Sequence, residues 1–383
     1  MISFDYQPRT RIIFGPGKLY SLGDLAGELG ARRVLLVSDQ GIIAAGHAQR
    51  AIDTLAKANI ETHVFSEFQE NPNSDDVEAG VKVARRYDPE LIVGLGGGSS
   101  MDCAKGINFV YSNGGRIQDY WGTGKALKPM LPMIAVPTTA GTGSEAQSYA
   151  LISDAVTHVK MACGDKKAAC RIAILDPALT VTQPRRVTAL TGIDAIAHAL
   201  ETYVTKPRNP MSLAFSREAW RLLAENFGKV LDHPADIDAR GAMQLGACFA
   251  GMAIESSMLG ATHALANPLT AEYGIVHGQA IGLMLPHVIR YNGEAFPDWY
   301  RELSDSLVGI NGFPSFDRGA NGLATFVAEL VRKADLPQRL SDCSVARESL
   351  PKMAEAAAKQ WTGTFNPRQV GVDELLSLYE RAF

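Results

Sequence analysis

The sequence predicts an α/β domain with a parallel sheet, followed by an all-helical domain. At 383 residues the chain is too long for one ordinary domain. Over residues 33–173 short apolar runs alternate with amphipathic segments, as in parallel sheets whose strands are joined by helices. From Pro184 onward Ala, Leu, Met and Glu recur at helical spacing. We therefore divide the chain into domains 1–180 and 181–383.

Three buried strands are predicted in the first domain. The runs VLLV (34–37), LIVGL (91–95) and MIAVP (133–137) are continuously apolar and are bounded by turn residues, which is typical of strands covered on both faces. A helix is predicted to start at Ser74, where a capping hydroxyl and the two carboxylates that follow it would meet the positive end of the helix.

The composition excludes several classes of partner. The chain has a net charge of -4 and no run of Lys and Arg, so it lacks the positive potential that would attract a nucleic acid. We also expect no membrane association, because no apolar stretch is long enough to span a bilayer. The five cysteines include no CxxC pair, which is typical of a protein in a reducing compartment. We interpret them as packing residues. We expect a cytoplasmic homo-oligomer, a dimer or larger, that acts on a small molecule.

A glycine-rich turn is the first candidate binding element. The segment LIVGLGGGSSMDCAKGINFVY (91–111) predicts a strand, a bare turn and a helix. Such a turn lets the backbone approach a diphosphate while the N-terminus of the helix points its free N–H groups at it, and Ser99 adds a hydroxyl. The segment lacks the usual dinucleotide fingerprint and the Walker pattern, so a tight turn without a ligand is an equal interpretation.

A second polar loop and one acid extend this candidate site. The loop PTTAGTGSEAQSYA (137–150) follows a strand and can line a ribose and a nicotinamide, or can be an ordinary polar loop. Asp39 follows the strand at 34–37, where a carboxylate can accept both hydroxyls of an adenosine ribose. The alternative for Asp39 is a turn or a helix cap.

Four residues of the second half form a candidate metal site. Asp194 and His198 lie four apart on a predicted helix, so their side chains share one face. Downstream, His263 lies in one helical run, and His277 opens the next after the break at Tyr273 and Gly274. Taken singly, each is better interpreted as a hydrogen-bonded or packed side chain than as a ligand. Together, three imidazoles and one carboxylate suit iron(II) or zinc.

Taken together, these segments resemble the iron-containing (group III) alcohol dehydrogenase family over nearly the whole chain. The resemblance implies a Rossmann-like N-terminal domain and an all-α C-terminal domain, an architecture shared with dehydroquinate synthase. The motifs stand in the order of the family: FGPGKL (14–19), the acid after the first strand, GGGSSMDCAK (96–105), PTTAGTGSE (137–145), ILDP (174–177), TGIDAIAHALE (191–201), and the block that contains His263 and His277.

The resemblance also implies a role for individual residues. Asp39 would hold the adenosine ribose of NAD, and the metal ligands would be Asp194, His198, His263 and His277. The other cofactor residues implied are Gly97, Gly98 and Ser99 at the diphosphate, and Asn71, Asp102, Thr138, Thr139, Thr142 and Lys160 around the rest of the cofactor.

One position departs from the family pattern. The family commonly has a second histidine four residues after the third ligand, within HAxAHPLG, whereas this chain reads HALANPLT. Asn267 therefore stands in place of that histidine, and Thr270 in place of the usual glycine. An amide does not titrate near neutral pH, so the path of the proton differs from the usual one.

The predicted function is hydride transfer between a small primary alcohol, or its aldehyde, and NAD, assisted by iron(II) or zinc as a Lewis acid. One alternative is a glycerol dehydrogenase-like or other polyol oxidoreductase of the same superfamily. A dehydroquinate synthase-like lyase is disfavoured, because the metal-bearing segments GIDAIAHALETY and GATHALANPLTAEYGIVHG contain no Lys or Arg for a phosphorylated substrate. A non-catalytic NAD-binding protein is the third alternative.

Overall fold

The chain forms two compact units in the computed structural model, which describes residues 3–309 and 318–383. We call them the sheet unit and the helical unit. The sheet unit comprises Gln7–Thr139 and Gly143–Gln183, and the helical unit comprises Met1–Tyr6, Ala140–Thr142 and Pro184–Phe383. The short segment Ala140–Thr142 thus belongs to the helical unit, although its neighbours in sequence belong to the sheet unit.

A six-stranded parallel sheet forms the centre of the sheet unit, with strand order β1-β9-β6-β4-β2-β3. The three predicted strands are confirmed as β2 (Arg33–Val37), β4 (Leu91–Gly96) and β6 (Met133–Pro137). Their residues are almost all buried, as continuous apolar runs predict. The other strands of this sheet are β1 (Arg11–Phe14), β3 (Glu61–Phe65) and β9 (Ile172–Leu175).

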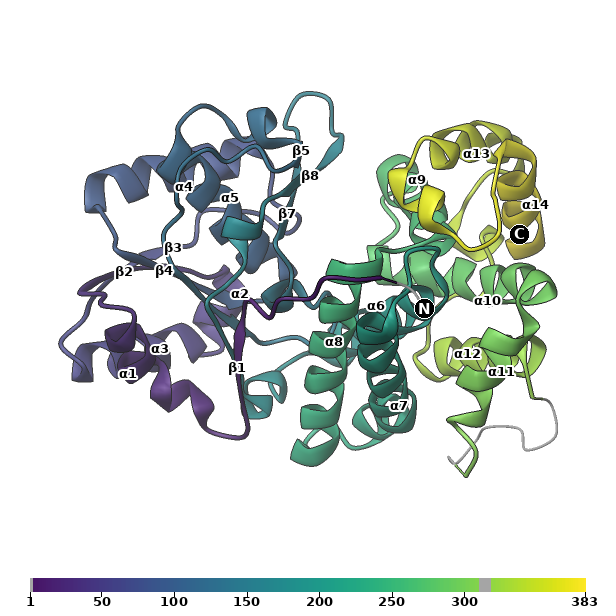
Figure 1. Cartoon of the computed structure of the whole chain (residues 1–383), viewed down its shortest axis with the longest axis horizontal. Helices are drawn as coiled ribbons and strands as arrows, with labels where there is room; N and C mark the ends of the chain where they lie inside the picture. Colours follow the sequence, from purple (N-terminus) through teal and green to yellow (C-terminus); the bar gives the residue numbers. More distant parts are fainter. Residues whose placement is uncertain (1–2, 310–317) are drawn as a thin grey trace. The chain divides into compact units, whose positions relative to one another are not determined.

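Helices cover both faces of this sheet (Figure 1). Helices α1 (Leu22–Glu28) and α3 (His47–Lys57) pack on one face, and α4 (Ser74–Tyr87) and α5 (Gly98–Asn113) lie on the other. A short helix, α2 (Gln40–Ala44), follows β2. Because the strands are parallel, their carboxyl ends meet at one edge of the sheet, and that edge is where a ligand of such a fold binds.

A second, three-stranded sheet has the order β5-β8-β7. In it, β7 (Tyr149–Ser153) and β8 (Lys160–Gly164) form an antiparallel hairpin, and β5 (Gly122–Thr123) pairs with β8. Only parallel strands were predicted from the sequence in this domain, so the antiparallel hairpin was not expected.

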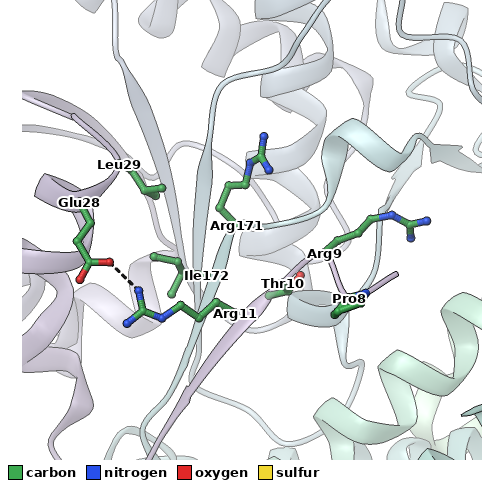
Figure 2. A pocket seen from close by; sticks show the side chains of 8 residues that line it. All are labelled: Pro8, Arg9, Thr10, Arg11, Glu28, Leu29, Arg171 and Ile172. Carbon is green, nitrogen blue, oxygen red and sulfur yellow. Dashed lines mark hydrogen bonds and ion pairs between the residues drawn. The ribbon is translucent and has the colours of Figure 1, made fainter. Parts of the chain in front are cut away.

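A pocket of about 420 Å³ lies at the amino ends of β1 and β9 (Figure 2). Its lining includes Arg9, Arg11 and Arg171, and Arg11 forms a 2.6 Å ion pair with Glu28. The glycine-rich turn follows the carboxyl end of β4, so it lies at the opposite edge of the parallel sheet. This pocket is therefore separate from the predicted cofactor site.

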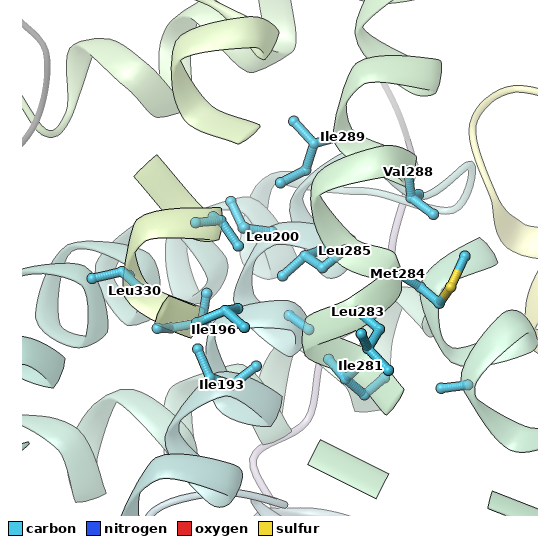
Figure 3. Close-up of a cluster of buried hydrophobic side chains, with 14 of the residues drawn as sticks. Ile193, Ile196, Leu200, Ile281, Leu283, Met284, Leu285, Val288, Ile289 and Leu330 are labelled. Atoms are coloured by element: carbon cyan, nitrogen blue, oxygen red, sulfur yellow. The ribbon is translucent and has the colours of Figure 1, made fainter. Parts of the chain in front are cut away.

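The helical unit contains helices from α6 to α14 around one apolar core. On α6 the apolar residues Ile193, Ile196 and Leu200 pack against residues of α10, such as Ile281 and Leu285 (Figure 3). The bounds are α6 (Arg185–Val204), α7 (Pro210–Asp232), α8 (Ile237–Ser257), α9 (Ala261–Tyr273), α10 (His277–Ala295), α11 (Pro297–Asp305), α12 (Ala320–Lys333), α13 (Leu350–Ala358) and α14 (Val372–Ala382).

The predicted break before His277 is confirmed. Helix α9 ends at Tyr273, and Gly274 follows with a φ of 64°, the left-handed conformation that favours glycine. Within the described residues no helix has both the length and the apolar content needed to cross a membrane. None of the five cysteines, all of which lie in the described part of the chain, forms a disulfide, and four of them are buried.

The start of α4 corrects one detail of the sequence analysis. The capping side chain is Asn73, not Ser74: Oδ1 of Asn73 accepts from the N–H groups of Asp75 and Asp76 at 2.8 and 3.1 Å. Asp76 in turn accepts from the N–H of Asn73 at 2.9 Å. The Ser74 hydroxyl instead accepts from the N–H of Ala155, a contact distant in sequence that the local pattern does not reveal.

We expect Asn73→Ala to lower the free energy of unfolding by about 1 kcal/mol, the typical cost of losing a helix cap. Urea unfolding followed by circular dichroism measures the change. Glu78→Ala, on the exposed side of the same helix, is the matched control, because it removes only a surface ion pair with Lys82. Equal stabilities for the two variants would contradict the capping role of Asn73.

Candidate functional site

The four predicted metal ligands converge on one point in the helical unit. Asp194 and His198 lie one turn apart on α6, His263 lies in the first turn of α9, and His277 is the first residue of α10. The Nε2 atoms of His198, His263 and His277 lie 3.4, 3.5 and 3.6 Å from Oδ1 of Asp194. Three imidazoles from three helices thus surround a single carboxylate oxygen.

This arrangement fits a bound metal ion. Four ligand atoms at about 2.1 Å from a tetrahedral centre are about 3.4 Å apart, close to the spacing seen here. Oδ1 of Asp194 and Nε2 of His263 are buried and have no hydrogen-bond partner among the described residues. One ligand atom each from Asp194, His263 and His277 lie within 4.8 Å of one another. A cation would give these buried polar atoms the partner that they need.

The charges in the cluster also favour a cation. Burial alone would raise the pKa of Asp194, but the neighbouring histidines outweigh it and hold this pKa well below its ordinary value. Burial opposes protonation of His263, yet the carboxylates of Asp194 and Glu201 raise its pKa to about 9. Burial lowers the pKa of His198. The carboxylate therefore needs a positive charge beside it, which a proton or a metal ion can supply.

The cluster is open on one side. The side chain of His277 is 29% exposed, whereas those of Asp194, His198 and His263 are 6–7% exposed. A small molecule can therefore approach next to His277. Since four protein ligands fill a tetrahedral shell, a substrate oxygen would have to join as a fifth ligand, and this exposed side is where it could reach the metal.

Glu201, which is not among the residues predicted from the sequence, contacts a predicted ligand. Oε2 of Glu201 lies 2.6 Å from Nδ1 of His263. Glu201 follows Asp194 by seven residues on α6, so the spacing of Asp194, His198 and Glu201 places all three on one helix face. The spacing of seven residues from Asp194 was a signal that could have pointed to Glu201, although it does not reveal the partner of this residue.

The predicted diphosphate residues lie at the carboxyl edge of the parallel sheet. Gly97 is the N-cap of α5, and no side chain caps this end of the helix. The ends of β4 and β6 are neighbours in register, and the N–H of Thr138 donates to the carbonyl of Gly96 at 2.9 Å. Gly96 has a φ of 149°, and a Cβ there would lie 2.2 Å from Oγ of Ser100. Only glycine allows this turn.

Thr139 and Asp39 lie on either side of this turn. A Cβ on Gly97 would lie 3.3 Å from Cγ2 of Thr139. Oδ2 of Asp39 accepts from the Ser100 hydroxyl at 3.0 Å, and Oδ1 caps α2 through the N–H of Ile42. Asp39 is thus a helix cap, the alternative raised from the sequence. It also stands next to the glycine-rich turn, as a ribose-binding carboxylate must.

Four more predicted cofactor residues form two hydrogen-bonded groups near α5. In the first, Nζ of Lys160 lies 3.5 Å from Oδ1 of Asn71, and the N–H of Asn71 donates to the Ser99 hydroxyl at 3.1 Å. In the second, Oδ1 of Asp102 accepts from the hydroxyl of Ser144 at 2.8 Å. Gly98 is the first residue of α5 and directly precedes Ser99, which belongs to the first group.

The buried Lys105, which the sequence analysis quoted only within a motif, fixes the loop that begins at Ser144. Its Nζ donates to the hydroxyl and carbonyl of Ser144 and to the carbonyls of Gln147 and Tyr149, at 2.6–3.0 Å. Of the predicted cofactor residues, Thr142 belongs to the helical unit, and the others belong to the sheet unit.

Asn267 lies on α9 one turn after His263. Its amide nitrogen donates to Oε1 of Gln360 at 2.9 Å. The position that departs from the family pattern therefore carries a pair of amides with no titratable group.

The chain matches two family models that together cover most of its length. The model "iron-containing alcohol dehydrogenase" matches residues 8–177, and the model "Fe-containing alcohol dehydrogenase family, C-terminal" matches residues 188–383. It is 34% identical to a 1,3-propanediol dehydrogenase of Klebsiella pneumoniae, over 99% of both chains. It is 31% identical to an NAD-dependent methanol dehydrogenase of Bacillus methanolicus, over the full length of both. A crystal structure of a 1,3-propanediol oxidoreductase matches with a TM-score of 0.95 at 33% identity, and the match covers 100% of both chains.

Proposed function

The chain belongs to the iron-containing alcohol dehydrogenase family, and we propose that it transfers a hydride between a small primary alcohol, or its aldehyde, and NAD, with the metal held by Asp194, His198, His263 and His277. The family membership makes the chain an NAD-dependent alcohol dehydrogenase with an iron site. The substrate and the roles of individual residues are the proposal.

One observation carries the assignment of the site. Three imidazole nitrogens lie 3.4–3.6 Å from one carboxylate oxygen, in a cluster that is buried except beside His277. Neutral imidazole and carboxylate ligands suit iron(II) and zinc. The partial opening leaves room for the oxygen of a small substrate.

The residues of the chain divide the work of the reaction between them. When bound, the metal supplies Lewis acidity at the substrate oxygen, and NAD accepts or returns the hydride. Asp39 would bind the adenosine ribose, and the glycine-rich turn with the N-terminus of α5 would bind the diphosphate. Asn267 cannot take a proton, so the proton of the alcohol would pass to water or to a ribose hydroxyl of the cofactor.

The names of the relatives support a small alcohol as substrate. They include dehydrogenases of methanol and of 1,3-propanediol, a diol. A polyol therefore remains the second candidate, supported by the propanediol enzymes. An anaerobic assay of iron-loaded protein against a panel of alcohols and aldehydes, monitored through NADH absorbance, tests both. Turnover of none of them would contradict the proposal.

We also propose that the enzyme acts in the cytoplasm as a homo-oligomer of two or more copies. The five cysteines, four of them buried, form no disulfide, which is compatible with a reducing compartment. Light scattering coupled to size-exclusion chromatography would give the mass of the assembly. A mass of one 41.2 kDa chain would contradict the oligomer.

We expect Asn267→His to add an ionisation near neutral pH to the profile of kcat against pH. An imidazole at this position changes its charge in that range, whereas the native amide does not. Gln360 can accept a hydrogen bond from either side chain, so the local structure should persist. The measurement compares both proteins with one alcohol at equal metal content. Superimposable profiles would refute a role of this position in proton transfer.

A further inference from the structure

We propose that Glu201 is a positioning residue that holds the imidazole of His263 with Nδ1 protonated, so that Nε2 presents its lone pair to the metal. The inference rests on the proposed metal-dependent function. It adds a residue that none of the predicted roles includes and that lies outside the four ligands.

The geometry fixes which nitrogen of His263 carries the proton. Glu201 is buried, and its Oε2 lies 2.6 Å from Nδ1 of His263. An ionised carboxylate can only accept hydrogen bonds, so Nδ1 must be the donor. A metal binds imidazole in its neutral form, which has one N–H, so with Nδ1 as the donor the free lone pair is on Nε2.

That lone pair faces the other ligands. Nε2 of His263 lies 3.5 Å from Oδ1 of Asp194, and neither atom has a hydrogen-bond partner among the described residues. A carboxylate on the far nitrogen of a ligating histidine fixes the orientation of the ring and raises its basicity as a ligand. Glu201 would therefore strengthen the bond from His263 to the metal.

Glu201 also anchors the start of α9, and this second role must be separated from the first. Its carboxylate accepts from the N–H groups of Gly260 at 3.1 Å and Thr262 at 2.6 Å. A Cβ on Gly260 would lie 3.1 Å from Oε1 of Glu201, a tight contact, so the carboxylate packs closely against the backbone at the start of α9. His263 is the third residue of this helix, so a displaced helix would displace the ligand too.

Asn366 supplies a matched control, because it anchors the same helix end without touching a ligand. Its Oδ1 accepts from the N–H of Ala261 at 3.3 Å, and its amide pairs with that of Asn292. Removal of Asn366 loosens the start of α9 but leaves the partner of His263 in place. Removal of the Glu201 charge changes that partner directly.

The test measures the affinity for zinc(II) of the purified full-length protein by competition with a chromophoric chelator. Glu201→Gln keeps the shape of the side chain, but it removes the charge and places an NH₂ group where only acceptors are needed. We expect the zinc affinity of Glu201→Gln to fall about ten- to hundredfold. We expect Asn366→Ala to lose thermal stability while its zinc affinity stays close to that of the wild type.

A wild-type affinity in Glu201→Gln would overturn the inference. Equal losses of zinc affinity in both variants would also overturn it, because anchoring of the helix would then explain the effect. If the wild-type protein binds no divalent metal, the proposed ligand set and this inference both fail. If the wild type binds zinc normally and Glu201→Gln has no effect on the affinity, the inference about Glu201 fails, whereas the proposed ligand set stands.

A second experiment observes the protonation of His263 directly in the wild-type protein. In zinc-loaded protein labelled with ¹⁵N-histidine, the resonances of His263 should show a protonated Nδ1 and a metal-bound Nε2. The opposite pattern, with Nδ1 bound to the metal, would overturn the proposal. Assignment of His263 by comparison with His263→Gln completes the experiment.

Discussion

His263→Ala and His277→Ala should each lose the bound metal and abolish alcohol-dependent NADH formation while the fold persists. Each variant removes one of the three imidazoles of the cluster. Nε2 lies 3.5 Å from Oδ1 of Asp194 in His263 and 3.6 Å from it in His277. With an incomplete ligand set the metal is lost or misplaced, and the polarisation of the substrate oxygen is lost with it. Metal content by atomic emission and activity on the same samples measure the two effects together.

His233→Ala is the matched control for these variants. His233 is an exposed histidine at the end of α7, remote in sequence from the predicted ligands. It should retain the metal content and the turnover of the wild type. Circular dichroism should show native helix content for all three proteins. Full activity in metal-free His263→Ala or His277→Ala would refute the ligand assignment.

The enzyme should prefer NAD over NADP, and Asp39→Gly should narrow or reverse that preference. A carboxylate at the adenosine ribose would face the 2'-phosphate of NADP. Like charges at about 4 Å cost on the order of 4 kcal/mol at an effective dielectric of about 20, before screening. Since each 1.4 kcal/mol is tenfold, this corresponds to roughly a thousandfold as an upper limit. Asp39 is only half-buried, and solvent reduces the effect.

Two substitutions separate the charge of Asp39 from its role as a helix cap. Oδ1 of Asp39 caps α2, and asparagine and glycine are both accepted at this position of a helix. Asp39→Asn should therefore keep the cap of α2 through Oδ1, with Nδ2 donating to the Ser100 hydroxyl in place of the bond that Asp39 accepts, yet reduce the discrimination against NADP. Ratios of kcat/KM for the two cofactors give the result. A wild-type preference for NADP would show that Asp39 does not face the ribose.

The parts of the fold that depend on local sequence patterns could be predicted. Strands β2, β4 and β6 are continuous apolar runs, because parallel strands are covered on both faces. The break between α9 and α10 could be located because Gly274 adopts a left-handed φ that other residues avoid. The site residues on α6 followed from helical spacing, since Asp194 and His198 share one face.

The parts that depend on tertiary contacts could not be predicted in the same way. Ser74 was expected to cap α4, but its hydroxyl binds the N–H of Ala155, and Asn73 is the cap. The bond between Glu201 and His263 joins residues 62 positions apart, so no local pattern reveals it. The hairpin of β7 and β8 belongs to a separate small sheet, so its antiparallel pairing does not follow from the parallel strands of the main sheet.

The location of the metal is the most direct test of the account. Crystals of the protein loaded with iron(II) under anaerobic conditions, measured at the iron absorption edge, should give one anomalous peak per chain. We expect it at about 2.0–2.3 Å from Oδ1 of Asp194 and from the Nε2 atoms of His198, His263 and His277. An active crystal with its peak elsewhere, or with no peak, would contradict the central claim that these four side chains hold the metal used in the reaction.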